Sequence, residues 1–339
     1  MDKQVLFIGT SYMNIYLDIV DELLAQGYSV DFIEEVEHSE DPDNVRGHNY
    51  ESPEAFEAKN AEYWENKLSL AQYSKCYDIL FVLDGQSISP CVFDILRQRN
   101  EHLYAVNYLF DTVRGVYRFD KNFQYFNKVA TFDILESNKF GIDLLPIFWP
   151  RLDCNTTNTY KLFGMGAFKH DRFKLFQELS KLAKENNLSY YFKLKVFPIK
   201  FFPFIYPFKM FFKRNRDFIK WKEFYSEFTT FSNVPLSEFK DMLCKSEIVV
   251  DTSAEHQDGL TSRFMWALGA GKKIITTNKS ADQYDFYDPS QILVIDDLSR
   301  LDSKEIQSFV LSNYSQSQKA KELALGYRID NWIRYLLNV

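Results

Sequence analysis

The sequence has few cysteines and no long apolar run. Only four of its 339 residues are cysteine, and they are scattered without a CxxC pair or the Cys/His spacing of a zinc site. The apolar runs fall short of the roughly 20 residues that a membrane-spanning helix needs. The first residues lack the basic start, apolar stretch and cleavage site of a signal peptide. We therefore expect reduced thiols, no metal requirement and a cytoplasmic protein.

Glycine is also scarce, with 12 residues, and none of them forms the G-x-G-x-x-G fingerprint of a dinucleotide-binding turn. Neither the turn at Gly9 nor the pair Gly164 and Gly166 matches it. This absence argues against hydride transfer with NAD. The net charge of −7 argues against a surface-wide affinity for nucleic acid, so an anionic partner has to meet a local basic patch.

What the sequence does contain is a repeated alternation of strands and helices. An apolar β run at 4–8 leads through Gly9 to a helical pattern at 13–25 and a second strand at 28–33, which is a βαβ unit. The first block continues with strands predicted at 78–83, 103–109, 129–132 and 144–148 and a helix at 90–99. This rhythm is typical of a parallel sheet covered by helices.

A polar stretch at 151–160 separates the first block from a second one with the same rhythm. Strands are predicted there at 161–164, 189–196, 248–251, 273–277 and 292–295, and helices at 172–185, 236–245 and 263–269. The predicted fold class is α/β, with two Rossmann-like domains facing a cleft and a C-terminal helix packing across them. The expected parts are 1–152, 153–320 with an insertion at 197–222, and the helix 321–339.

The most informative stretch runs from Asp251 to Arg263, where a strand leads through a polar loop into a helix. Ligands of open parallel sheets bind beyond the carboxyl ends of the strands, and a helix N-terminus attracts anions. Gly259 permits close backbone approach, while an arginine grips a diphosphate through two nitrogens. The loop therefore suits a nucleotide diphosphate, and the alternative is a capped helix with a surface arginine.

The block from Gly259 to Thr276, GLTSRFMWALGAGKKIIT, resembles the donor-domain signature of GT-B glycosyltransferases, notably bacterial capsule and lipopolysaccharide enzymes and their CgeB-like relatives. Asn278, the run 284–287 and the run 163–166 with Arg172 add to the likeness. The resemblance implies two Rossmann-like domains, with the nucleotide sugar held mainly by the C-terminal one and the acceptor by the N-terminal one. We expect no cofactor beyond the donor substrate.

One position departs from this pattern. Trp266 stands where many GT-B donor sites carry a glutamate that holds the ribose or the sugar. The tryptophan either stacks on a base or sugar or packs inside the protein, and we favour packing. The residues expected to bind the donor are Thr10, Ser11, Gly166, Arg172, Lys193, Asp251, His256, Gly259, Leu260, Thr261, Ser262 and Arg263. Helix capping is the alternative role of Thr10 and Ser11, and a structural hydrogen bond that of His256.

Sugar transfer with inversion needs a general base, whereas retention needs mainly stabilisation of the departing diphosphate. Asp111 at the end of a predicted strand is the first candidate base, Asp84 the second and Asp133 the third. Each has a turn or cap role as its alternative. The cations Arg263, Arg172 and Lys193 would neutralise the leaving group without a metal.

The segment from Lys193 to Lys222 interleaves aromatic and basic side chains, with Asp217 its only acid. Such a mixture suits the headgroup region of an anionic membrane. Its prolines break any long helix, although a helix is predicted at 208–223. The segment is expected to attach the protein to the inner membrane surface, with internal packing as the second interpretation and nucleic acid a distant third.

The leading hypothesis is a glycosyltransferase that moves a sugar from a nucleotide-sugar donor to a surface glycan of capsule, lipopolysaccharide or exopolysaccharide, carried on a lipid. A catalytically degenerate GT-B-like scaffold is the alternative, motivated by Trp266. An epimerase of the sugar-nucleotide class is a third, weakened because Tyr-x-x-x-Lys is missing at a suitable site and the glycine fingerprint is absent. The sequence leaves the sugar, the acceptor, the linkage and the oligomeric state open.

Overall fold

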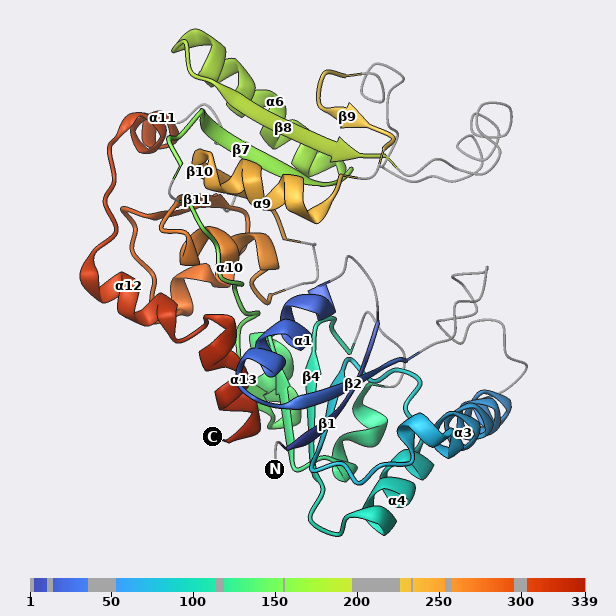
Figure 1. Ribbon diagram of the computed structural model, residues 1–339. Coiled ribbons are helices and arrows are strands. Elements are labelled where there is room, and N and C mark those ends of the chain that lie inside the picture. The colour runs from blue at the N-terminus through green and yellow to red at the C-terminus, as the bar shows by residue number, and fades with distance from the viewer. Residues whose placement is uncertain are drawn as a thin grey trace, which may run out of the picture. The chain divides into compact units, whose positions relative to one another are not determined.

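The computed structural model describes residues 3–10, 15–35, 53–113, 119–154, 156–196, 226–232, 234–253, 258–295 and 304–338. The chain divides into two compact units. The first unit comprises Met1–Pro150, His256–Leu260 and Gly326–Val339, and the second comprises Arg151–Glu255 and Thr261–Leu325. Each unit has a six-stranded sheet with helices on it (Figure 1). The predicted α/β class with two parallel sheets is confirmed.

The sheet of the first unit has the order β2-β1-β3-β4-β5-β6, and every neighbouring pair is parallel. Its strands are β1 (Gln4–Gly9), β2 (Ser29–Glu34), β3 (Ile79–Leu83), β4 (Tyr104–Leu109), β5 (Lys128–Thr131) and β6 (Asp143–Leu144). The strand order reverses between β1 and β3, so the carboxyl ends of these two strands form the switch point at which ligands of such sheets bind.

Two layers of helices cover this sheet. Trp64 and Leu68 of α3 (Pro53–Ser69) and Phe93 of α4 (Pro90–Arg99) lie in one core with the side chains of β1 and β3. On α13 (Ile329–Leu337), Trp332 contacts Phe81 and Tyr108, with ring centroids 6.1 and 4.6 Å apart. Alternate side chains of a strand point to opposite faces, so α13 covers the other face, where it meets α1 (Ile15–Ala25) (Figure 1).

The sheet of the second unit has the order β12-β11-β10-β7-β8-β9, again with parallel pairs throughout. Its strands are β7 (Tyr160–Ala167), β8 (Tyr190–Lys195), β9 (Thr229–Thr230), β10 (Ser246–Asp251), β11 (Lys273–Thr276) and β12 (Ile292–Val294). Relative to chain order this is the doubly wound 3-2-1-4-5-6 arrangement of dinucleotide-binding sheets, and its switch point lies between β7 and β10.

Helix α6 (His170–Glu185) lies along one face of this sheet, where Phe176 stacks on Phe192 of β8 with ring centroids 4.4 Å apart (Figure 1). Helix α11 (Lys304–Leu311) shares that core. Helix α9 (Leu236–Cys244) covers the opposite face, because its Phe239 meets Phe163 of β7 at 5.4 Å. The remaining helices of the described residues are α5 (Ile134–Phe140), α10 (Ser262–Gly269), α12 (Gln318–Leu325) and the 3-10 turns Ala71–Tyr73, Phe119–Tyr125 and Lys279–Gln283.

Most predicted elements are present with small shifts of their ends. The prediction was wrong at β6, which has two residues rather than the five of 144–148, and it missed the short β9. The helix predicted at 208–223 and nearly all of the aromatic-basic segment lie outside the described residues. In the described part of the chain, no helix is long and apolar enough to cross a membrane.

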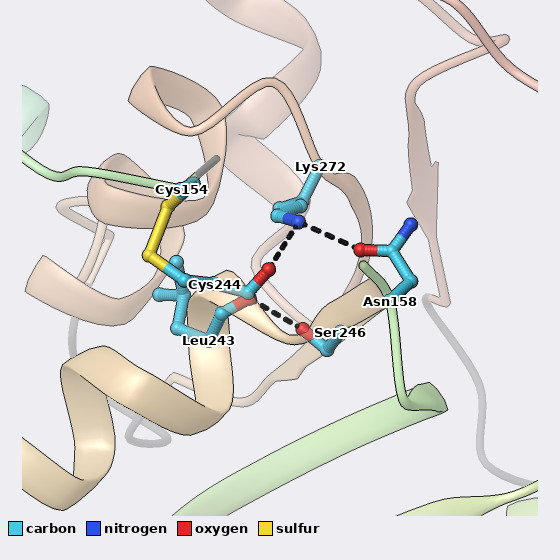
Figure 2. Close-up of a disulfide and its surroundings, with 6 residues drawn as sticks. All are labelled: Cys154, Asn158, Leu243, Cys244, Ser246 and Lys272. Carbon is cyan, nitrogen blue, oxygen red and sulfur yellow. Dashed lines mark hydrogen bonds between the residues drawn. A yellow bond between two sulfur atoms is a disulfide. The ribbon is translucent and has the colours of Figure 1, made fainter. Parts of the chain in front are cut away.

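The expectation of reduced thiols was wrong for two of the four cysteines. Cys154 and Cys244 form a disulfide with a Cα separation of 4.6 Å, across 90 residues of sequence. Figure 2 shows Lys272 beside it, where Nζ donates to the carbonyl of Cys244 at 2.7 Å and to Oδ1 of Asn158 at 3.1 Å. These contacts tie the segment after Pro150 to the end of α9. Only the tertiary fold brings the two cysteines together, so their spacing carried no signal.

The disulfide predicts a thiol count. Protein denatured without reductant is expected to react with a thiol reagent at two cysteines, Cys76 and Cys91, and at all four after reduction. Mass spectrometry of the alkylated peptides assigns the sites. Because closing so long a loop restricts the unfolded chain, the C154S/C244S variant should lose about 2–4 kcal/mol of unfolding free energy, whereas C76S should lose none. Four reactive thiols in oxidised protein would contradict the assignment.

Candidate functional site

The switch point of the second sheet is organised around Asp251, the last residue of β10. Its side chain is fully buried and accepts hydrogen bonds from Oγ1 of Thr261 at 2.7 Å, Nη1 of Arg263 at 2.8 Å and Oγ1 of Thr276 at 3.0 Å. Burying a carboxylate is costly unless it is paired and hydrogen-bonded, and these three donors meet that requirement. Asp251 therefore positions Arg263 and the start of α10.

One nitrogen of the Arg263 guanidinium is hydrogen-bonded, and another has no partner among the described residues. Its side chain is 14% exposed, and Nη1 is engaged by Asp251. Nε is buried and has no hydrogen-bond partner among the described residues. A buried donor without a partner costs about 1–3 kcal/mol, so the guanidinium is arranged to gain from an acceptor that approaches it.

Arg172, in the first turn of α6, lies at the same switch point. It is 6% exposed, and its guanidinium donates to Oγ1 and the carbonyl of Thr252, which follows β10, and to the carbonyl of Ala167 at the end of β7. A Cβ on Gly166 would lie 2.5 Å from Nη1 of Arg172 and 3.0 Å from Nη2 of Arg263. Glycine at this position therefore lets both guanidinium groups lie against the strand.

Positive charge exceeds negative charge around these side chains. Burial, and then repulsion from Arg263, lowers the pKa of Arg172 to about 9 despite the opposing effect of Asp251. Lys169, an exposed residue just before α6, also has a lowered pKa, because of burial of its amine and then repulsion from Arg172 and Arg263. Arginine keeps its proton in proteins, so this direction indicates that the site favours an added anion.

The residues of the loop and of the first turn of α10 next to Arg263 have either capping or packing roles. Thr261 is the N-cap of α10, with Oγ1 accepting from the backbone N–H of Phe264 at 3.2 Å, and Ser262 is the half-buried first residue of the helix. Leu260 is fully buried. Thr261 thus has a capping role, the alternative to ligand binding that its position in the sequence allowed, and its hydroxyl also donates to Asp251.

Gly259 is constrained by the protein itself. A Cβ there would lie 2.3 Å from the ring of Phe132 and 2.8 Å from its carbonyl oxygen. The backbone N–H groups of Asp258 and Gly259 donate to Oδ2 of Asp133 at 3.0 and 3.1 Å. Oδ1 of Asp133 accepts from the first turn of α5, so this buried aspartate caps a helix and anchors the loop. That geometry leaves Asp133 no role as a base.

Lys193 does not join the arginines. It lies on β8 between Phe192 and Leu194, which belong to the core beneath α6, so its side chain points to the opposite face of the sheet. Its amine lies 5.8 Å from the ring centroid of Tyr191 on that face. Arg172 and Arg263 are therefore brought together, and Lys193 is not. Ser11 and His256 lie outside the described residues, and Thr10 is half-buried after β1.

In the first unit, Asp84 and Asp111 meet beyond the ends of β3 and β4. Asp84 adopts a left-handed backbone with φ of 70°, and its Oδ1 accepts from the N–H groups of Phe110 at 2.6 Å and Asp111 at 3.2 Å. Aspartate is among the few residues that tolerate this conformation, which concentrates at functional sites. Burial raises the pKa of Asp84, and the negative charges of Asp111 and Glu35 raise it further. The hydrogen bonds from the two N–H groups act in the opposite direction.

Glu35 is a buried acid that the sequence analysis missed. It is 1% exposed, and burial raises its pKa to about 7 against hydrogen bonds from Ser87 and Gly85 that lower it. In the sequence it is one of several glutamates in an acidic stretch, and nothing distinguishes it from its neighbours. The described residues contain no group of three or more His, Cys, Asp or Glu side chains that could hold a metal.

Trp266 has the packing role that the sequence analysis favoured. It is 2% exposed, and its ring meets Phe239 of α9 with centroids 5.6 Å apart. The position that departs from the GT-B pattern is thus part of the core of the second unit.

Comparisons with known proteins address the fold. The sequence matches no protein-family model, and no curated protein matches it. Among solved structures, the UDP-GlcNAc 2-epimerase of Methanocaldococcus jannaschii is similar with a TM-score of 0.55 at 10% identity, covering 99% of this chain and 100% of that one. The UDP-GlcNAc 2-epimerase of Neisseria meningitidis, bound to UDP-GlcNAc, gives 0.51 at 9%, covering 99% and 98%.

A third structure, OtsA in its apo form, is similar with a TM-score of 0.54 at 10% identity, covering 100% of both chains. At these identities the likeness carries information about the fold alone. Together with the two parallel sheets, it establishes that this chain has the two-domain α/β fold of the GT-B type.

Proposed function

We propose that this protein is a glycosyltransferase that moves a sugar from a nucleotide-sugar donor to a hydroxyl of a glycan. The observation that carries the proposal is the group of three cations at the switch point of the second sheet, Lys169, Arg172 and Arg263, with the buried Nε of Arg263 unpartnered among the described residues. A similar fold bound to UDP-GlcNAc supports a nucleotide sugar as the ligand class.

In this proposal the second unit holds the diphosphate. Arg263 and Lys169 bind its oxygens, Arg172 adds positive charge from its fixed position, and the first N–H groups of α6 and α10 face the anion. As the bond between the sugar and the diphosphate breaks, negative charge grows on the leaving oxygen. Cations that are already in place stabilise that charge without reorganising, which lowers the barrier.

The first unit supplies the base. Both hydrogen bonds of the Asp84 side chain fix Oδ1, so Oδ2 is the oxygen that takes the proton from the acceptor hydroxyl as its oxygen attacks the anomeric carbon. The electrons of the broken bond pass to the diphosphate. Asp111, which the sequence ranked first, is exposed and contributes its backbone N–H to Asp84. We therefore assign the base to Asp84 rather than Asp111.

The proposed class of acceptor is supported by features of the sequence. The resemblance to capsule and lipopolysaccharide enzymes and the aromatic-basic segment support a surface glycan on a lipid carrier, with the enzyme held peripherally at the inner membrane face. Binding to vesicles with and without anionic lipid tests this part by itself.

A sugar-nucleotide epimerase is the second candidate. Two of the structures with this fold are UDP-GlcNAc 2-epimerases. The lack of a Tyr-x-x-x-Lys at a suitable site and of a glycine fingerprint therefore does not exclude an epimerase. The two functions differ in their products, since an epimerase converts the donor to an isomer without an acceptor, whereas a transferase releases the nucleotide.

The proposal is tested by a thermal-shift screen of UDP-, GDP-, TDP- and CMP-sugars, followed by product analysis of the best donor. Bound ligand stabilises the folded state by an amount that grows with the logarithm of its concentration relative to Kd, so a true donor raises Tm. K169A should bind that donor about 10-fold more weakly, because a charge-assisted hydrogen bond is lost, while its own Tm stays unchanged. K174A, an exposed lysine of the same helix, is the control. No shift with any donor would contradict the proposal.

A further inference from the structure

The disulfide between Cys154 and Cys244 lies at the amino ends of three neighbouring strands of the second sheet. Cys154 precedes β7, Cys244 precedes β10, and the adjacent Lys272 precedes β11. The strands are parallel, so the three cations beyond the carboxyl ends of β7 and β10 are at the other edge of the sheet. The residues of β10, at about 3.3 Å each, separate the two edges by roughly 20 Å. A change at the disulfide therefore leaves these cations in place.

Cys154 belongs to the connector along which the chain passes from the first unit, ending at Pro150, to the second. The connector begins at a firm anchor in the first unit. Trp149 donates its N–H to the carbonyl of Tyr327 at 3.1 Å, and its carbonyl accepts from the N–H of Ile329 at 3.0 Å. The chain before the connector is thus paired with the segment that leads into α13.

The disulfide determines where the connector ends in the second unit. With the bond in place, only residues 150–153 lie between Trp149 and the cross-linked Cys154. The next backbone anchor among the described residues is Thr159, whose N–H donates to the carbonyl of Lys245 at 2.7 Å. Breaking the disulfide therefore lengthens the connector from 150–153 to 150–158, about a doubling.

The two sulfur atoms are in different surroundings. Cys154 is half-buried and follows the exposed Asp153, whereas Cys244 is 6% exposed, so a reductant reaches Sγ of Cys154 first. Nζ of Lys272 lies beside the bond and donates to the carbonyl of Cys244 and to Asn158 (Figure 2). An ammonium has three donors, and a cation next to a cysteine stabilises its thiolate. Cys244 is therefore suited to be the leaving thiolate.

We propose that the disulfide between Cys154 and Cys244 is a reversible modification site, reduced in the folded protein by a dithiol protein, and that its reduction lengthens the connector between the two units. Disulfides of cytoplasmic proteins are usually catalytic or redox-sensing rather than permanent, and the sequence leads us to expect a cytoplasmic protein. The inference goes beyond the proposed function, because the site lies at the opposite edge of the sheet from the three cations.

The exchange balances in two steps. A thiolate of the dithiol attacks Sγ of Cys154, the S–S bond breaks, and Cys244 leaves as a thiolate with the electron pair. The second thiol of the reductant then attacks the mixed disulfide and releases Cys154. Two electrons and two protons pass from the dithiol to the protein, and the reductant becomes a disulfide. An oxidised partner of the same class restores the bond by the reverse exchange.

The direct test is limited proteolysis of the folded full-length protein with trypsin, which cuts after the exposed Arg151. A peptide bond between two nearby anchors opens rarely. Treatment with dithiothreitol, removed under nitrogen before trypsin is added, should speed this cut by at least about 10-fold. C154S/C244S should be cut at the fast rate with or without this treatment, and C76S should behave as wild type. Mass spectrometry of the fragments identifies the cut.

Two outcomes would overturn the proposal. One is a disulfide that dithiothreitol reduces only after the protein is denatured, since the bond would then be a permanent cross-link. The other is cleavage after Arg151 at the same rate in the oxidised and reduced forms, which would show that reduction does not free the connector.

The effect on turnover rests on the proposed function, in which the two units supply different groups to one reaction. Loop-closure entropy grows with connector length, so reduction should lower donor turnover by about threefold. Affinity for the diphosphate should stay within about twofold, and C154S/C244S should not respond to the reductant. A freed connector with unchanged turnover would refute this coupling. A freed connector in a protein that turns over no donor would leave the redox site standing and contradict the transferase.

Discussion

Replacing Asp84 by asparagine is expected to lower the turnover of the donor by about 10²- to 10⁴-fold, the range that a positioned general base contributes. Asparagine tolerates the left-handed backbone with φ of 70°. Its amide oxygen can also accept the two N–H groups of Phe110 and Asp111 that Oδ1 accepts now. The substitution therefore removes the proton acceptor while keeping the turn, and the donor affinity should be unchanged.

The matched control is D111N, because Asp111 is exposed and meets Asp84 through its backbone rather than its carboxyl group. We expect D111N to keep at least about a third of the wild-type rate at a pH where Asp84 is ionised, because it removes a charge that raises the pKa of Asp84 but leaves the carboxyl group of Asp84 in place. Steady-state kinetics of nucleotide release, with Tm measured for each variant, check both expectations. If D84N were as active as D111N, Asp84 would be a turn residue and the base would have to be sought elsewhere.

Replacing Arg263 by lysine is expected to weaken binding of the nucleotide diphosphate by about 10- to 100-fold, although the positive charge is kept. Nη1 of Arg263 is engaged by Asp251 while Nε has no partner among the described residues. One guanidinium can therefore bind the buried carboxylate and a phosphate at once. A lysine ammonium is a single point charge on a flexible stem, and pairing with Asp251 would leave the phosphate without its donor.

Calorimetric titration of R263K with the best nucleotide measures this loss. R334K, an exchange on the exposed side of α13, is the control for any general effect of arginine substitution. Because Asp251 keeps a cationic partner in R263K, no buried charge is left unpaired, and the unfolding free energy of R263K should remain within about 1 kcal/mol of wild type. Equal affinities of R263K and wild type would show that the free edge of the guanidinium binds no phosphate.

The sequence predicted the framework of the fold because its strands are short apolar runs that end in polar turns. It also placed Arg172 and Arg263 at one site, since both follow strands that meet at a switch point. The sequence did not distinguish the residues that would contact the ligand from those that hold the contacting residues in place. Asp251 was expected to touch the ligand, yet it is fully buried and holds Arg263. Gly259 was expected to approach a phosphate, and its close neighbour is Phe132.

What the sequence missed depends on contacts between distant segments. Glu35 becomes a buried acid only because the turn at Ser87, 52 residues later, closes over it. In the sequence, Lys169 resembles any residue that precedes a helix. Its place in the candidate site depends on Arg172 and Arg263, and Arg263 lies on another helix. Lys193 was assigned to the wrong group because alternation along β8 sends it to the opposite face. The roles expected of Ser11 and His256 remain predictions.

The measurement that tests the central claim most directly is calorimetric binding of a nucleoside, its monophosphate and its diphosphate, run in the uridine, guanosine and thymidine series. If Lys169, Arg172 and Arg263 form a diphosphate site, affinity in one series should rise at least about 10-fold from nucleoside to diphosphate and fall with added salt. Equal affinity for the nucleoside and its diphosphate, or no binding in any series, would contradict the account.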